Sequence, residues 1–192
     1  KAEMTALSEP CHKYGLYLFL DGARLGYGLA APDNDLTLPD IAALCDVFYI
    51  GGTKVGALFG EAVVIKNPEL AQDFRYLIKQ NGGMLAKGRL LGLQFDALFT
   101  DGLYQEISAH AIAMAEKLRE AFTAKGYTYL APNRTNQIFV IVPDAHLAKI
   151  SEQFEYSYDQ RIDATHSCVR FCTGWATREE NVDALIRCVE QL

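Results

Sequence analysis

Short apolar runs separated by polar turns dominate the first third of the chain. Residues 1–9 have the pattern of a helix end, and a polar turn after Pro10 leads into the apolar run Gly15–Leu20. A short helix is predicted at Pro39–Leu44, before a second apolar run at Val47–Ile50. Uninterrupted apolar runs of this length indicate buried strands. Strand, helix and strand in this order predict a parallel βαβ unit with a right-handed crossover.

The next segment returns to the sheet and then becomes helical. Ala57–Ile65 is strand-like and close enough to the second apolar run to pair back antiparallel. Residues 68–125 predict helices with breaks at 82–83 and 100–102. The helix Met84–Phe99 is apolar around much of its circumference, so we expect it to be buried within the protein or against a subunit.

Strands and helices alternate again from Gly126 onwards. The predicted elements are strands at Tyr127–Leu130, Gln137–Val142 and Ser167–Thr173, and helices at Asp144–Phe154 and Arg178–Leu192. Thr177 and Glu180 resemble a capping box at the start of the last helix.

These patterns predict an α/β fold in three parts. We expect residues 1–102 to belong to a large domain, 103–125 to form a connecting helix, and 126–192 to form a small C-terminal α/β domain. With 192 residues, half of them apolar, the chain can bury a sizeable core.

Composition narrows the classes of partner. A net charge of −6 with scattered basic residues argues against nucleic acid and anionic membranes. No apolar stretch approaches the roughly 18 residues that span a bilayer, and the first residues lack a signal-peptide pattern. Five cysteines without a C-x-x-C pair predict free thiols and no metal site. We therefore expect a cytoplasmic protein.

Two charged residues follow the two apolar runs of the predicted parallel pair. Asp21 comes directly after Leu20, and Lys54 follows the turn Gly51–Thr53. Ligands of parallel sheets bind at the carboxyl ends of the strands. A lysine there can hold the aldehyde of pyridoxal phosphate (PLP) as a Schiff base, while an aspartate on the neighbouring strand pairs with the protonated ring nitrogen. The spacing predicts a PLP site in an enzyme that transforms amino acids.

Neighbouring residues fit the same cofactor. The methyl group of Ala23 is small enough to lie against one ring face, and Thr53 places a hydroxyl beside the lysine where a phosphate can bind. The alternatives are a solvated turn lysine at Lys54 and a helix N-cap at Asp21. The glycine-rich, apolar surroundings of Lys54 favour an enclosed site, in which desolvation promotes the neutral amine.

Two arginines are candidates for binding a substrate carboxylate, because a guanidinium group matches a carboxylate with two parallel donors. Arg24 follows Ala23, and Arg170 lies inside the otherwise apolar run Ser167–Cys172. A charge in such a run requires a partner. The alternative is an arginine that points outward from an edge strand.

Five short motifs now occur together, in an order and at spacings typical of one family. They are Leu20-Asp21-Gly22-Ala23-Arg24-Leu25, Gly51-Gly52-Thr53-Lys54-x-Gly56, Gly60-Glu61-Ala62-Val63-Val64, Gly82-Gly83-Met84 and Val169-Arg170-Phe171-Cys172-Thr173. With these motifs the chain resembles, from about residue 3 to its end, the L-threonine aldolase family of the β-eliminating lyase group.

The resemblance implies part of a fold-type I PLP-enzyme large domain, with a mostly parallel sheet and flanking helices, plus a small C-terminal domain. It implies that Lys54 carries the cofactor, that Asp21 binds the pyridine nitrogen, and that Arg24 and Arg170 hold the substrate carboxylate. The implied reaction is cleavage of a β-hydroxy-α-amino acid such as threonine to glycine and an aldehyde, by a homodimer or homotetramer.

Some family features have no counterpart among these residues. Family members begin well before this point, with a phosphate-binding loop and a side chain stacked on the ring, and Phe19 stands where many have histidine. We therefore expect a carboxyl-terminal part that is inactive alone. The alternatives are another PLP-dependent reaction (β-elimination, racemisation or transamination), or an inactive fragment or pseudoenzyme with a structural or regulatory role.

Overall fold

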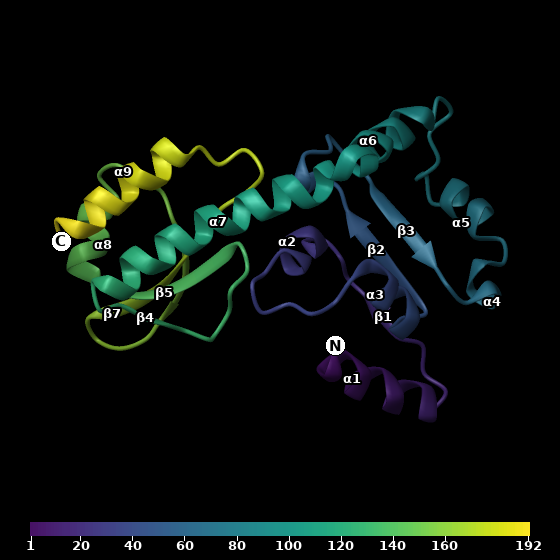
Figure 1. The fold of residues 1–192 in the computed structure, drawn as a ribbon, viewed down its shortest axis with the longest axis horizontal. Coiled ribbons are helices and arrows are strands. Elements are labelled where there is room, and N and C mark those ends of the chain that lie inside the picture. The colour runs from purple at the N-terminus through teal and green to yellow at the C-terminus, as the bar shows by residue number, and fades with distance from the viewer. The chain divides into compact units, whose positions relative to one another are not determined.

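A computed structural model describes all 192 residues, which divide into two compact units of mixed α/β structure (Figure 1). The first unit comprises Lys1–Leu29 and Asn34–Gln105. The second unit comprises Ala30–Asp33 and Glu106–Leu192.

The first unit contains a three-stranded sheet in the order β1-β2-β3. Its elements are α1 (Ala2–Lys13), β1 (Phe19–Leu20), α2 (Leu25–Leu29), α3 (Leu38–Leu44), β2 (Val47–Gly51), η1 (Thr53–Val55), β3 (Glu61–Ile65), α4 (Pro68–Ala71), α5 (Phe74–Gln80), α6 (Arg89–Phe99) and η2 (Thr100–Gly102). Strand β2 pairs in parallel with β1, with Phe19 opposite Val47, and antiparallel with β3, with Tyr49 opposite Val63. The parallel pair and the antiparallel return strand that we predicted are both confirmed.

The two faces of this sheet differ in burial. Phe48 and Ile50 of β2 are 2% and 7% exposed, because their side chains belong to the core of the first unit. Phe19 and Val63 lie on the opposite face and are 58% and 47% exposed. We call this second side the open face, and Tyr49 belongs to it by strand alternation.

The start of the chain is more helical than we predicted. Helix α1 continues through Pro10 to Lys13, where the expected turn was wrong. Proline removes one backbone donor from a helix, but the residues after it still close a turn, because the Tyr14 amide donates to the Pro10 carbonyl at 3.1 Å. The strand that follows is shorter than the apolar run Gly15–Leu20, since only Phe19 and Leu20 pair with β2.

Helix α6 differs from its prediction in length and in burial. It begins at Arg89, five residues later than expected, and Leu98 is its one buried residue. Leu90 and Leu93 are 55% and 59% exposed. A helix that is apolar on most sides can bury only the side that contacts its own sheet, so the remaining leucines stay in contact with solvent in this chain.

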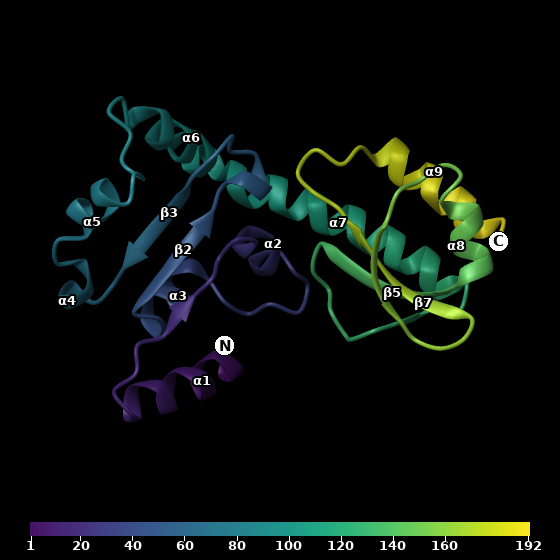
Figure 2. The same ribbon diagram turned by 180° about the vertical axis from the view of Figure 1, so that it is seen from behind.

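The second unit is a four-stranded antiparallel sheet in the order β4-β5-β7-β6. Its elements are α7 (Leu103–Ala124, whose first turn belongs to the first unit), β4 (Thr128–Tyr129), β5 (Gln137–Pro143), α8 (Asp144–Ile150), β6 (Ser157–Arg161), β7 (His166–Cys172) and α9 (Glu179–Glu190). Residues of α7, α8 and α9 form one core with alternate residues of β5 and β7, and both views place α7 and α9 along one side of this sheet (Figures 1 and 2). None of the helices combines the length and hydropathy needed to cross a membrane.

Two local features of the second unit differ from the sequence prediction. Strand β6 was missed, because all five of its residues are exposed and the segment has no apolar face to signal a strand. The capping box at Thr177 and Glu180 was wrong. The Thr177 hydroxyl accepts a hydrogen bond from the Gly174 amide at 2.8 Å, so it is used in the preceding turn, and Arg178 is the N-cap of α9.

The core of the second unit gives the first prediction. Phe122 is fully buried, and its ring centroid lies 5.3 Å from that of Phe171. Phe122→Ala should lower the free energy of unfolding by about 3–5 kcal/mol, because it leaves a cavity in a close-packed core. Tyr158→Ala is the matched control, since Tyr158 is 60% exposed on the edge strand β6. Equal urea midpoints for the two variants would contradict the packing described.

Candidate functional site

The candidate site in the first unit lies where β1 and β2 end. Asp21 directly follows β1, and the short helix η1, which contains Thr53 and Lys54, follows β2. Because the two strands are parallel neighbours, their carboxyl ends meet at one edge of the sheet. The Gly51 amide donates to the Gly22 carbonyl at 2.9 Å, so the backbone pairing continues past the end of β1.

Two glycines allow these strand ends to approach closely. A Cβ atom on Gly22 would lie 1.6 Å from the Tyr49 carbonyl oxygen, and one on Gly51 would lie 2.5 Å from the Ala23 carbonyl oxygen. No side chain fits at such distances from backbone atoms. The glycines at this edge therefore bring the Asp21 segment into direct contact with β2.

The Asp21 carboxylate is held through one of its two oxygens. Oδ1 accepts hydrogen bonds from the Ala23 amide at 3.0 Å and from the Tyr49 hydroxyl, whereas Oδ2 accepts none. The Tyr49 hydroxyl, the Ala23 amide and the charges of Lys54 and Arg24 lower the pKa of this carboxyl. Asp21 is exposed, so Oδ2 is an ionised acceptor available to a ligand.

Lys54 has a fixed backbone and a free side chain. Its carbonyl accepts a hydrogen bond from the hydroxyl of Tyr27, which is 1% exposed, and the next residue, Val55, is also 1% exposed. The Lys54 side chain itself is exposed. The enclosed surroundings that we expected around this side chain are therefore not formed by this chain.

The other predicted residues of this unit lie around the same edge. Ala23 and Arg24 are partly buried in the segment between β1 and α2, and Thr53 is exposed at the start of η1. Arg24 forms no ion pair with a carboxylate of the chain, although its charge contributes to the lowered pKa of Asp21. The structure thus brings together five of the six predicted site residues.

Arg170, the sixth, lies in β7 of the second unit and does not point into that unit's core. Its neighbours Val169 and Phe171 are buried, whereas Arg170 is paired across the sheet with Phe139, whose ring lies 6.0 Å from the Arg170 Cζ. Nη1 donates to the Gln137 Oε1 at 3.3 Å, and Nε is buried without a hydrogen bond. No carboxylate of the chain pairs with this guanidinium group. The group can therefore bind an external anion.

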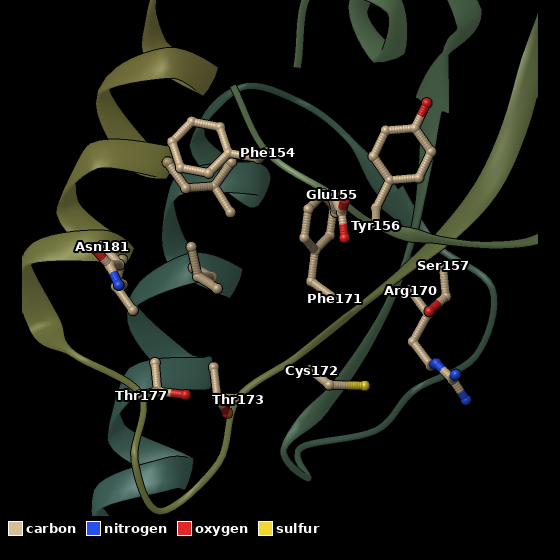
Figure 3. Close-up of a pocket in the computed structure, with 13 residues that line it drawn as sticks. Phe154, Glu155, Tyr156, Ser157, Arg170, Phe171, Cys172, Thr173, Thr177 and Asn181 are labelled. Carbon is tan, nitrogen blue, oxygen red and sulfur yellow. The ribbon is translucent and has the colours of Figure 1, made fainter. Parts of the chain in front are cut away.

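A cavity of about 340 Å³ lies beside Arg170 in the second unit. Phe154, Phe171 and Leu185 contribute apolar walls, and Thr177 and Asn181 contribute polar groups. Figure 3 shows the Arg170 and Cys172 side chains extending away from the side on which Phe171, Thr173 and Asn181 lie. The guanidinium group is therefore at the margin of this cavity, and its donors face the other side of the strand.

Sequence reasoning missed two tyrosines at the first site. Tyr49 could have been found from strand alternation, because β2 places it on the same face as Phe19 and hence next to Asp21. Tyr27 gave no such signal. Its contact with the Lys54 carbonyl joins residues 27 positions apart, and only the folded chain reveals it.

The donors and acceptors present fit PLP. In the first unit, a lysine amine without a partner matches the aldehyde of PLP, and an ionised carboxylate oxygen without a donor matches its pyridinium nitrogen. No group of three or more histidine, cysteine, aspartate or glutamate side chains is arranged to hold a metal ion.

The close approach of the strand ends gives the second prediction. Gly22→Ala should destabilise the protein by about 3 kcal/mol, because the new methyl group would overlap the Tyr49 carbonyl oxygen and push the end of β1 away from β2. Gly28→Ala is the control, since a Cβ there meets nothing within 4 Å. Thermal and urea unfolding of both variants provide the comparison, and equal stability would show that these strand ends are not tightly packed.

Comparisons with known proteins place the chain in a family. Residues 1–145 match the beta-eliminating lyase family. The chain is 31% identical over 187 residues to a low specificity L-threonine aldolase of Pseudomonas sp., with 95% of this chain and 52% of that protein covered. A threonine aldolase structure from Leishmania major superposes with a TM-score of 0.96 at 42% identity, with 99% of this chain and 56% of that chain covered.

More distant structures share the fold alone. Serine palmitoyltransferase from Sphingomonas wittichii has a TM-score of 0.67 at 13% identity. The predicted fold class and the resemblance to threonine aldolases are confirmed, and the chain spans about half the length of the curated relatives that it matches. Its match over three quarters of its residues shows that the chain belongs to the beta-eliminating lyase family.

Proposed function

We propose that the complete protein uses PLP to cleave a threonine-like β-hydroxy-α-amino acid to glycine and an aldehyde. The observation that carries this proposal is the pairing of strand ends, which sets the Asp21 carboxylate beside the turn that bears Lys54. The similarity to the Leishmania major threonine aldolase across 99% of the chain supports aldol cleavage over other PLP-dependent reactions.

The residues of the first unit would hold and activate the cofactor. When bound, PLP withdraws electrons from the Cα of a linked amino acid, which allows a bond to that carbon to break. The Lys54 amine holds the cofactor aldehyde and yields this position to the substrate amine. Asp21 keeps a proton on the ring nitrogen through Oδ2, because a nearby carboxylate raises the pKa of that nitrogen. Ala23 supports a ring face, and Thr53 offers a hydroxyl to the phosphate.

The two arginines would position the substrate. Arg170 binds the α-carboxylate through its planar donors, and Arg24 assists from the segment after β1. A buried Nε without a hydrogen bond supports this role, since an unpaired donor in a folded protein carries an energetic cost that a ligand can remove.

The proposal extends to assembly and location. We propose a homodimer or homotetramer, supported by the exposed leucines Leu90 and Leu93 of α6, which a second subunit would cover. We also propose that the first unit is part of the large cofactor domain, that the second corresponds to the small domain after the connecting helix 103–125, and that the protein is cytoplasmic.

Loss of the amine at position 54 gives the third prediction. The complete protein should release glycine and acetaldehyde from threonine, and Lys54→Ala should reduce this release to background because the cofactor loses its attachment. Borohydride reduction with PLP followed by peptide mapping should find the cofactor on Lys54 in the wild type.

Lys66→Ala is the control for this prediction, because Lys66 is an exposed lysine in the same unit, just after β3. Formation of 2-oxobutyrate with ammonia, of 3-hydroxy-2-oxobutyrate, or of the Cα epimer of threonine in place of glycine would identify β-elimination, transamination or racemisation instead. A cofactor attached to another lysine would refute the role of Lys54, and failure of the complete protein to bind PLP would indicate a non-catalytic role.

The chemistry of guanidinium gives the fourth prediction. Arg170→Lys should raise the KM for threonine at least about tenfold, because a point charge replaces a fork of two donors. Arg187→Lys is the control, since Arg187 is exposed on α9. If the melting temperature falls while KM is unchanged, Arg170 has a structural role only.

A further inference from the structure

The hydroxyl of Tyr49 donates a hydrogen bond to the Asp21 Oδ1 across the parallel pair β1 and β2. This contact is the largest single cause of the lowered pKa of Asp21. None of the five sequence motifs includes Tyr49, which precedes the glycine-rich motif by two residues.

Tyr49 is held in place from several sides. Its strand, β2, is the central strand of the sheet, and its backbone carbonyl lies against Gly22. Its ring lies 6.1 Å from the ring of Phe19 on the open face, with an interplanar angle of 41°. The backbone cannot shift without disturbing the strand pairing, and the ring packs against Phe19, so the hydroxyl is directed at Asp21.

The direction of this hydrogen bond is set by its partners. The Asp21 carboxylate raises the pKa of Tyr49 to about 12, so the phenol keeps its proton at neutral pH. The carboxyl, in turn, has a lowered pKa and is ionised. Tyr49 is therefore the donor, and as a protonated phenol it cannot act as a general base at neutral pH.

We infer that Tyr49 is a positioning residue that fixes the Asp21 carboxylate by its Oδ1 and leaves Oδ2 for the ring nitrogen of PLP. This inference rests on the proposed function of Asp21. With two donors on Oδ1, the Ala23 amide and the Tyr49 hydroxyl, rotation of the carboxylate costs two hydrogen bonds. With the Ala23 amide alone, rotation costs only one hydrogen bond. The carboxylate then holds Oδ2 less firmly towards the protonated ring nitrogen of PLP.

The hydrogen bond also keeps Asp21 charged over a wider pH range. A donor to the ionised form stabilises that form, so removing it raises the pKa of Asp21 towards its ordinary value. Without the Tyr49 hydroxyl, acidification therefore protonates Asp21 at a higher pH than in the wild type. The affinity for PLP falls at that higher pH as well.

The experiment compares Tyr49→Phe with wild type in the complete protein. Phenylalanine keeps the ring that contacts Phe19 and removes only the hydroxyl. The ¹³C signal of the Asp21 carboxyl, assigned by its absence in Asp21→Asn, is titrated without cofactor, and PLP affinity is measured from pH 4 to pH 8. Tyr76→Phe is the matched control, because Tyr76 is 75% exposed.

Tyr49→Phe should move the Asp21 titration and the acid loss of PLP affinity to higher pH. It should also lower kcat for aldol cleavage roughly tenfold with KM unchanged, the loss expected for a hydrogen bond to a charged group. Tyr49→4-aminophenylalanine, which restores a donor, should recover part of each effect. Tyr76→Phe should behave as wild type.

The outcomes separate this inference from the proposed function. If Tyr49→Phe leaves the Asp21 titration and the acid limb of PLP binding unchanged, the inference is wrong, whatever Asp21 does. If the Asp21 titration moves but Asp21→Asn leaves the ¹⁵N shift of the PLP ring nitrogen unchanged, Asp21 does not pair with that nitrogen, and both the proposed role and its positioning fail.

Discussion

The backbone approach of Gly22 to the Tyr49 carbonyl is the constraint on which the first unit depends. At this point β1 has ended, yet the Gly51 amide still donates to the Gly22 carbonyl and keeps the two segments paired. Because no side chain separates them, Asp21 reaches the Tyr49 hydroxyl and lies within the electrostatic influence of Lys54. The placement of the Asp21 carboxylate is thus a consequence of a steric requirement for glycine.

The two units share one arrangement of burial. In each, one sheet face packs into a core and the other presents polar groups with unused hydrogen-bonding capacity. These groups are Oδ2 of Asp21 in the first unit and Nε of Arg170 in the second. The buried Nε of Arg170 is costly in a fold that has no ligand, whereas the Oδ2 of Asp21 is exposed and free to accept a hydrogen bond.

Much of the fold could be predicted from periodicity, because local patterns report which side of an element is apolar. The β2 strand, the α3 helix and the alternation of strands and helices after Gly126 all followed from this signal. The signal failed for β6, whose residues are all exposed. Periodicity also failed to predict the burial of α6. Apolar residues lie on most sides of this helix, so the pattern does not indicate which side is buried.

The sequence by itself determined the candidates for the site, since Asp21 and Lys54 each follow an apolar run and Arg170 interrupts one. Tertiary structure alone decided their partners. Tyr49 reaches Asp21 across 28 positions, and Tyr27 fixes the Lys54 backbone across 27 positions. The physical reason is that hydrogen bonds between distant segments depend on strand register and backbone approach, which exist only once the sheet has formed.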